Sequence, residues 1–495
     1  MDFDVEYDVV VVGGGASGKS AAYTVATESD LSVAVLEKME ETGGSGVYAE
    51  GTAAAESSEQ KARTKVDYYG GDAPEGAHYP SCQELYQRYI DYSHHRANPD
   101  VAKAFAYNSA ETIDIFKKLG VEFTDVVIYA YDQPNELYTF HRPDGLGARE
   151  QELLLRGCVN EGVDIFTSTP AKSLIMEDGV VKGLVATDAD GNEMKIGAKA
   201  VILASGGMGN NMEMVGKYSW IPDIAKTNHA CVPTQNTGDG IRMAIDAGAD
   251  TRALGTLMIM STVPDHTLGC QLHAAGSQPV LWVDRFGKRF CNEIVAMSFA
   301  DAGNINALTD GGVMFPIMDS DYVEYLKKEG SEIGLGDFVP YGSSIDFEGE
   351  LEESLAAHDG AAFKADSIEE LAEMIGADKD TLTATVKRYN ELAEKGDDED
   401  YFKPAKFLRT IKKAPFYAIK MVPSILVSDG GIRVNGDMQV TDKSYEPIAG
   451  LYAVGNEASG LYGDTYNLDC PGSANGFAHT SGRLAARHAI KTING

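Results

Sequence analysis

The feature that most constrains this chain is the stretch 9–38, which reads strand, tight turn, helix, strand. A β-branched run, typical of a buried parallel strand, leads directly into a G-x-G-x-x-G turn. In such a turn Gly13 permits the bend, Gly15 lets the backbone approach a pyrophosphate, and Gly18 lets the helix pack closely on the strand. The first N–H groups of the helix face the phosphates, and Glu37 ends the second strand, where it can accept hydrogen bonds from a ribose diol. A glycine-rich turn alone is a weak signal, but these parts together predict a dinucleotide site.

Composition limits the classes of partner. The chain has 495 residues, 43% of them hydrophobic, which indicates a globular protein of two or more domains. Its formal net charge is −33, and such a surface without a basic patch is not expected to bind nucleic acid or an anionic membrane. Solubility is the simplest reason for the charge. No apolar run approaches the length of a membrane span.

The six cysteines are scattered and form no C-x-x-C pair, which argues against a disulfide framework and against zinc, iron–sulfur or haem sites. We therefore expect no metal. The first strand begins close to the N-terminus, so the given chain shows no signal peptide. We expect a cytoplasmic protein, or an extracytoplasmic one if a signal peptide has been removed.

Further segments predict backbone that passes close to a bulky cofactor. Small residues dominate positions 42–55, and an apolar strand at 200–209 also ends in small residues; a flexible loop is the alternative for the first of these. Asp239 precedes an amphipathic helix and has two interpretations, N-cap of that helix or ligand of a cofactor hydroxyl. Residues 56–90 are polar and predict loop, and 396–401 predict an acidic loop. The α/β character fades near residue 254 and returns near Pro423, as in a dinucleotide domain with an inserted domain.

Several stretches together resemble the flavoprotein superfamily of fumarate reductases and succinate dehydrogenases, within it the flavocytochrome c and 3-ketosteroid dehydrogenase branches. The segments that carry this resemblance are 11–18, 37–44, 203–207, 237–240, 287–293, 388–390, 414–418 and 450–486. The resemblance implies FAD and an α/β fold, in which a Rossmann-like FAD-binding domain of the glutathione-reductase type is interrupted by an α+β cap. We expect domains at 1–253 (FAD-binding, first part), 254–423 (cap, substrate) and 424–495 (FAD-binding, second part).

The motif and the resemblance also predict which residues bind FAD. Succinate dehydrogenases carry a flavin-linking histidine near the position of Ser45, and none is present here, so the FAD is expected to be noncovalent. The expected cofactor-binding residues are Gly13, Gly15, Ala16, Ser17, Gly18, Glu37, Lys38, Gly43, Gly44, Ser45, Gly51, Thr52, Ala171, Ala204, Ser205, Gly206, Asp239, Gly455, Asn456, Glu457, Ser473 and Ala474.

Departures from the fumarate reductase pattern concern the substrate. Fumarate reductases place an arginine proton donor where Met297 stands, a histidine where this chain has the aliphatic run 425–427, and a carboxylate-binding arginine where Asp469 falls. A dicarboxylate would meet a methionine, an aliphatic residue and an acid. Fumarate is therefore not expected as a substrate.

The last loop fits ketosteroid dehydrogenases better. Their pattern has a tyrosine that helps to polarise a substrate ketone, and Tyr466 matches it, although about two extra residues follow. We expect Tyr466 as the catalytic residue, with Tyr462 as its rival and a packed aromatic as the structural alternative. His266 and His273 are possible proton carriers, but a lone histidine is more often structural.

These observations predict an FAD-dependent enzyme that reduces an activated C=C bond of a small organic molecule, such as an enone, a lactone or an enoate. Hydride would come from flavin N5, with a proton from a side chain. One alternative is a ketosteroid-type 1,2-dehydrogenase that runs the reverse reaction. Another is an electron-carrier flavoprotein, although a carrier has no need of a closing cap. An external electron donor or acceptor is implied, and the sequence does not identify it.

Overall fold

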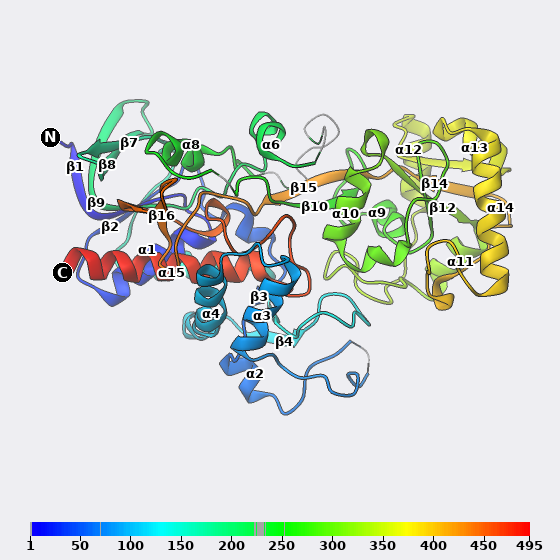
Figure 1. Cartoon of the computed structure of the whole chain (residues 1–495), viewed down its shortest axis with the longest axis horizontal. Coiled ribbons are helices and arrows are strands. Elements are labelled where there is room, and N and C mark those ends of the chain that lie inside the picture. The colour runs from blue at the N-terminus through cyan, green and yellow to red at the C-terminus, as the bar shows by residue number, and fades with distance from the viewer. Residues whose placement is uncertain (1, 70, 222–223, 225–231, 233, 252) are drawn as a thin grey trace.

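The structure is a computed structural model that describes residues 2–69, 71–221, 224, 232, 234–251 and 253–495. Both termini lie at one end of the long axis, beside the main sheet, and a second body of helices and strands occupies the other end (Figure 1).

The main sheet has eight strands, and its centre is parallel. β1 pairs with β2 on one side and with β9 on the other, so that Val9 lies beside both Val33 and Ala200. The last four residues of β1 are buried, as expected for a strand covered on both faces. β17 brings the C-terminal part of the chain into the same sheet, parallel to β9. The strands are β16 (Gln439–Thr441), β17 (Pro447–Ala453), β8 (Val180–Thr187), β9 (Glu193–Leu203), β1 (Val5–Val12), β2 (Val33–Leu36) and β6 (Asp164–Phe166), with β7 (Ala171–Glu177) paired to β8.

Two long helices pack against each other beneath this sheet: α1 (Ala16–Glu28), which follows the glycine turn, and α15 (Ser473–Asn494), which ends the chain (Figure 1). Their backbones approach closely, because a Cβ at Gly482 would lie 2.2 Å from the carbonyl oxygen of Ser17. Two segments far apart in sequence thus share one side of the sheet. Further elements of this half are η1 (Gly44–Tyr48), α4 (Pro99–Leu119), α5 (Leu146–Asn160), α6 (Met212–Tyr218), α8 (Asp239–Asp246) and η5 (Gly455–Glu457).

A smaller sheet lies below the first in Figure 1. Its strand order is β3 (Thr52–Ala53), β5 (Phe140–Pro143), β4 (Phe123–Val127). The polar segment 56–90, which lies between β3 and β4 in the chain, was predicted as loop, and this is wrong in part, because it contains α2 (Ser58–Ala62) and begins α3 (Cys82–Tyr92). Ser57 and Ser81 form capping boxes there, a signal that the sequence carries as S-x-x-Q and S-x-x-E.

The chain leaves the FAD-binding half along β10 (Leu257–Thr262) and returns along β15 (Val422–Ser428), which form an antiparallel two-stranded sheet (Figure 1). We call the body between these strands the cap. Its sheet has the order β11 (Leu281–Asp284), β12 (Met314–Asp319), β14 (Phe416–Ile419), β13 (Ala362–Ala365). Its helices are α9 (Gln271–Gly276), η2 (Glu293–Met297), α10 (Phe299–Ala307), η3 (Asp310–Gly312), α11 (Ser320–Lys328), α12 (Glu348–Ala357), α13 (Ile368–Ile375), α14 (Lys379–Lys395) and η4 (Ala405–Phe407). The domain boundaries at 253/254 and 423/424 stay a prediction.

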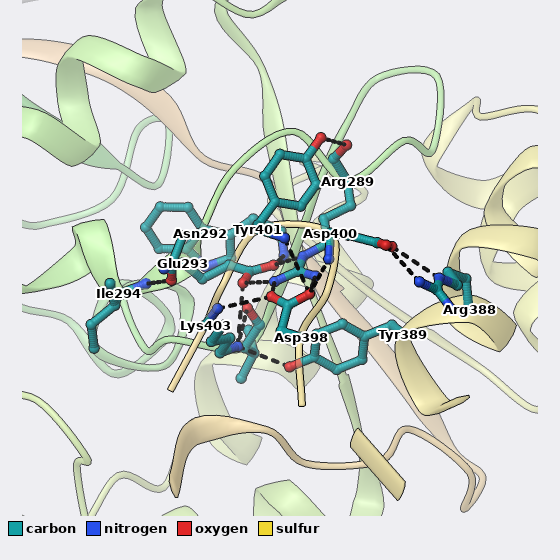
Figure 2. A network of polar contacts seen from close by, with 12 residues as sticks. Arg289, Asn292, Glu293, Ile294, Arg388, Tyr389, Asp398, Asp400, Tyr401 and Lys403 are labelled. Atoms are coloured by element: carbon teal, nitrogen blue, oxygen red, sulfur yellow. Dashed lines mark hydrogen bonds and ion pairs between the residues drawn. The ribbon is translucent and has the colours of Figure 1, made fainter. Parts of the chain in front are cut away.

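A buried network of charges holds the cap together (Figure 2). The Arg289 guanidinium donates to Glu293 at 2.8 Å and to Asp398 at 2.7 Å, and the Lys403 ammonium lies 3.4 Å from Glu293. The side chains of these four residues are at most 6% exposed. Lys403 also donates to the Tyr389 hydroxyl at 2.8 Å. The segment 396–401 is therefore more than an acidic loop, because Asp398 carries one of the two buried negative charges.

The strand, turn, helix and second strand predicted at 9–38 are present as β1, the glycine turn, α1 and β2. The apolar strand predicted at 200–209 is the end of β9, which stops at Leu203. Among the described residues no helix is both long and apolar enough to cross a membrane, and no group of three or more acids, histidines or cysteines is placed to hold a metal ion.

Candidate active site

The main cavity has a volume of about 830 Å³ and runs from the glycine turn to the meeting point of the cap and the FAD-binding half. Segments from both halves of the sequence line it, together with residues of β10, β15 and α10. Among the residues expected at the site, those that line the cavity are Gly13, Gly15, Ala16, Ser17, Glu37, Lys38, Gly44, Ser45, Gly51, Ala171, Ala204, Ser205, Gly206, Asp239, Asn456, Ala474 and Tyr466.

The three glycines of the turn have the geometry that the motif requires. Gly13 has φ +113°, and a Cβ there would lie 2.4 Å from the carbonyl oxygen of Ala204. A Cβ at Gly18 would lie 1.9 Å from the Gly13 oxygen, so helix and strand pack too closely for a side chain. A Cβ at Gly15 would meet only the Gly43 oxygen at 3.8 Å, and Gly15 lines the cavity. The space at Gly15 thus belongs to the cavity, where a pyrophosphate is expected.

At the nucleotide end of the cavity, Glu37 accepts hydrogen bonds from the N–H groups of Gly14 at 2.8 Å and Met39 at 2.9 Å. Each carboxylate oxygen keeps a lone pair for a ribose hydroxyl. Lys38 Nζ lies 2.7 Å from Asp239. Asp239 is the first residue of α8, and its side chain makes no capping hydrogen bond, so the N-cap interpretation is wrong. A cofactor role for Asp239 stays a prediction.

Seven of the expected residues lie behind the cavity wall. Glu457 accepts from the Ser205 hydroxyl at 2.8 Å and from the Gly207 N–H at 3.1 Å, and Thr52 donates to Glu150 at 2.7 Å. Such residues shape the backbone that faces the cavity. The set comprises Gly18, Gly43, Thr52, Gly455, Glu457, Ser473 and Tyr462.

The described residues fit a flavin dinucleotide. The N-termini of α1 and α15 both reach the cavity, through Ala16 and Ala474, and the first N–H groups of a helix have no partner within it. The amide oxygen of Asn475, which also lines the cavity, is buried without a hydrogen-bond partner in the protein. A ligand rich in phosphate and ring donors satisfies both features.

The cap end of the cavity is apolar and aromatic. Residues from β10, α10, a cap loop, β15 and the last loop form this wall: Met258, Met260, Phe299, Phe338, Leu426 and Leu468. These residues could not be predicted from the sequence, because they come from separate segments whose apolar pattern is the same as that of core residues. Glu50, an acid within a run of small residues, lines the same end and was not predicted either. Among the described lining residues, the only Lys or Arg is Lys38.

Tyr466 lines the cavity and Tyr462 does not, so the structure separates the two candidates by position. The Tyr466 ring stacks on Phe299 with centroids 6.1 Å apart, and its hydroxyl interacts with Ser473 and with the backbone at Ser473 and Ala474, the start of α15. Burial raises the pKa of Tyr466, while those interactions act to lower it. Tyr462 donates to the Ser473 hydroxyl at 3.1 Å from behind the wall.

The remaining candidates lie outside the cavity wall. His273 is buried, its Nε2 lies 3.1 Å from the Ser261 carbonyl, and burial lowers its pKa to about 4. His266 and Met297 do not line the cavity, and Asp469 pairs with Arg88 at 3.0 Å. The structural interpretation of His273 is thus supported by its contacts.

Comparisons with known proteins agree with this geometry. The family described as FAD binding domain matches residues 8–470. A vinyl phenol reductase of Lactiplantibacillus plantarum is 34% identical over 500 residues, which cover 98% of this chain and 96% of the reductase. A cytochrome-type fumarate reductase of Shewanella frigidimarina is 29% identical over 489 residues, which cover 98% of this chain and 77% of that protein. The structure of a 3-ketosteroid Δ1-dehydrogenase from Sterolibacterium denitrificans aligns with a TM-score of 0.76 at 22% identity, covering 98% of this chain and 100% of that one.

The chain belongs to this FAD-binding family. It is an FAD-dependent oxidoreductase, and its relatives reduce or dehydrogenate carbon–carbon bonds. The resemblance seen in the sequence and the α/β fold are both confirmed. Noncovalent attachment of the FAD stays a prediction.

Proposed function

We propose that this chain reduces the C=C bond of a small, neutral, unsaturated molecule with an aromatic or enone character. One observation carries the proposal: the cap end of the cavity has apolar and aromatic walls, and among the described residues no arginine lines it. The one Lys or Arg among the described lining residues of the whole cavity, Lys38, lies at the nucleotide end, where it is paired with Asp239.

The reason is electrostatic. A dicarboxylate in a dry cleft needs paired cationic donors, and an uncompensated buried charge costs several kcal/mol. Leu426 and Val427 line the cavity where fumarate reductases are expected to use a histidine, and Glu50 adds a negative charge to the same end. A neutral alkene with a flat ring matches these walls.

The residues have distinct roles in the proposed reaction. When bound, the reduced flavin supplies a hydride to one carbon of the double bond. The cavity wall at Phe299 and Phe338 excludes water and orients the ring of the substrate. Tyr466 donates a proton from its hydroxyl to the other carbon, and the start of α15 stabilises the oxygen left behind.

The test uses holoenzyme reduced under anaerobic conditions and mixed with a panel of alkenes, with reoxidation of the flavin absorbance as the signal. We expect styrene-type alkenes and cyclic enones to reoxidise the flavin rapidly and fumarate to do so slowly. The proposal fails if fumarate is the fastest oxidant.

A second candidate is dehydrogenation of a 3-oxosteroid. It is favoured by the tyrosine of the last loop, Tyr466, which matches the ketosteroid dehydrogenase pattern and lines an apolar cavity. A 3-oxosteroid 1-dehydrogenase of Mycolicibacterium smegmatis is 31% identical over 377 residues. Bleaching of the oxidised flavin by a saturated 3-oxosteroid would identify this direction. Both candidate reactions need an external electron donor or acceptor, and neither reaction determines its identity.

A further inference from the structure

Glu50 is a carboxylate that the proposed reaction does not use. It follows η1 and lines the cap end of the cavity together with Tyr129, Phe299 and Tyr466. Its neighbours are otherwise the apolar and aromatic walls described above. A carboxylate that faces a dry, aromatic cleft needs hydrogen-bond donors to compensate for its lost hydration.

A loop of the cap supplies two such hydrogen-bond donors to Glu50. Residues 336–338 form the tip of a tight loop, closed by the backbone pair Leu335 and Val339. Oε1 of Glu50 accepts from the N–H groups of Asp337 at 2.6 Å and Phe338 at 3.0 Å. The tip approaches closely because residue 336 is glycine, with φ +56°; a Cβ there would lie 2.6 Å from Oε2 of Glu50.

Glu50 has a further hydrogen-bond partner in Tyr129. The Tyr129 hydroxyl hydrogen bonds to Glu50, and the Tyr129 ring packs edge-on against Phe299, with centroids 5.7 Å apart. Phe299 in turn stacks on Tyr466. The acid and the tyrosine proton donor are thus two polar groups of one aromatic-walled space. A carboxylate oxygen that accepts one hydrogen bond retains capacity for another.

We infer that Glu50 receives and deprotonates the hydroxyl of a phenolic substrate, so that this site reduces 4-hydroxystyrenes. The inference rests on the proposed function and names its substrate class. The charged and polar groups around Glu50 are compatible with a role as a base. Asp337 repels its charge but is itself paired with Arg142 at 3.4 Å, and Tyr129 supplies a hydrogen bond. Burial raises the pKa of Glu50 to about 7, so it is a competent base near neutral pH.

The chemistry explains why a base is needed. A styrene has no electron-withdrawing group, so its double bond is polarised only when the para hydroxyl loses a proton. Glu50 takes that proton; the electron pair released moves through the ring, and the terminal carbon takes a proton from Tyr466. The result is a neutral quinone methide. The hydride then adds to the benzylic carbon and restores the phenolate, which recovers its proton from Glu50. In total, one hydride and one proton are added to the double bond, and the product is a 4-ethylphenol. The flavin that gave the hydride is oxidised, and solvent reprotonates the tyrosinate of Tyr466.

The closing experiment measures binding, independently of turnover. Oxidised holoenzyme is titrated with 4-ethylphenol and with 4-ethylanisole, which cannot donate a hydrogen bond, between about pH 6 and about pH 9, around the pKa of Glu50 near 7. We expect the phenol to bind about tenfold or more tightly than the anisole. The preference should be lost as the pH falls below about 7, where Glu50 is protonated and cannot accept the proton.

The test variant is Glu50→Gln, which keeps an oxygen for the cap N–H groups and removes the base. Its phenol preference should fall to about twofold or less, while Glu353→Gln, on the exposed face of α12, retains the preference. The stack of Tyr131 on Tyr341, with centroids 3.8 Å apart, still joins the cap to the other half in Glu50→Gln. The inference is overturned if wild-type protein binds the two ligands alike or if Glu50→Gln keeps the preference.

Failure of the proposed function has a different signature. It would show as reduced wild-type enzyme that fumarate reoxidises faster than any neutral alkene, or that no alkene reoxidises, whatever the binding result. If wild-type enzyme reduces a cyclic enone and Glu353→Gln reduces 4-hydroxystyrene normally while Glu50→Gln does not, both statements hold. If Glu50→Gln reduces 4-hydroxystyrene at the wild-type rate, the assignment of Glu50 is wrong and the proposed function stands.

Discussion

Replacing Tyr466 with phenylalanine tests the proton donor with little disturbance of the fold. The Tyr466 ring packs between Phe299, with centroids 6.1 Å apart, and Tyr462, with centroids 5.4 Å apart. Tyr466→Phe keeps both contacts and removes only the hydroxyl at the start of α15. FAD content and the unfolding transition should therefore match the wild type.

The expected loss of rate follows from the position of that hydroxyl. A positioned acid contributes about 10²- to 10⁴-fold, or roughly 2.7 to 5.4 kcal/mol of barrier. The oxygen left after donation faces the first N–H groups of α15, which stabilise a negative charge, so we expect the upper part of this range. The assay is single-turnover reoxidation of reduced flavin by a saturating alkene, which separates the proton step from substrate binding.

Tyr462→Phe is the matched control, because Tyr462 is a neighbouring buried tyrosine that does not line the cavity. It should react within about twofold of the wild-type rate, since it loses a hydrogen bond to Ser473 and no proton donor. If Tyr462→Phe is slow and Tyr466→Phe is normal, the role belongs to Tyr462. Normal rates in both variants would show that the proton comes from another group or from water.

Two further variants test the cofactor turn and the cap. Gly15→Val should retain its fold and lose FAD content about tenfold or more, because its side chain fills the pyrophosphate space; in wild-type protein, acid precipitation should release the flavin into the supernatant. Asp398→Ala should lower the free energy of unfolding in urea by about 3–5 kcal/mol, because it leaves Arg289 short of one buried counter-charge, whereas Asp397→Ala on the surface should change it little. Burial acts to raise the pKa of Asp398, but hydrogen bonds from Arg289 outweigh it and lower the pKa to about 2, so this stabilisation is present above about pH 4 and is lost as the pH falls toward 2.

The nucleotide end of the site could be predicted from the sequence because its signals are local. The turn, its helix and the acid at Glu37 lie within one βαβ unit, and each glycine has a steric reason that involves residues close by or on the neighbouring strand. The three glycines accordingly show the spacing and conformation that the motif requires. Capping patterns at Ser57 and Ser81 were equally local and could have corrected the loop assignment of the segment between them.

The substrate end could not be predicted in this way. Glu50 precedes Phe299 and Phe338 by more than 200 positions, the two phenylalanines lie on different elements of the cap, and no local pattern relates the three. Asp398 shows the same limit within one segment. Its neighbours are exposed acids, so composition indicates a solvated loop, and only the approach of Arg289 from a distant strand end makes it a buried ion.

This division has a chemical consequence. The nucleotide end is built on the carboxyl ends of β1, β2 and β9, where rigid parallel strands fix the backbone that faces the cofactor. The substrate end is built on a cap loop, on the two strands that connect the cap, and on the last loop, none of which belongs to that sheet. Aliphatic residues at 426–427 or an acid at position 50 therefore change the polarity and charge of the substrate end and leave intact the turn that is expected to bind the pyrophosphate. Within one hydride chemistry, selection between a dianion and a neutral phenol then rests on a few side chains, and Glu50→Gln and Tyr466→Phe address the two polar ones directly.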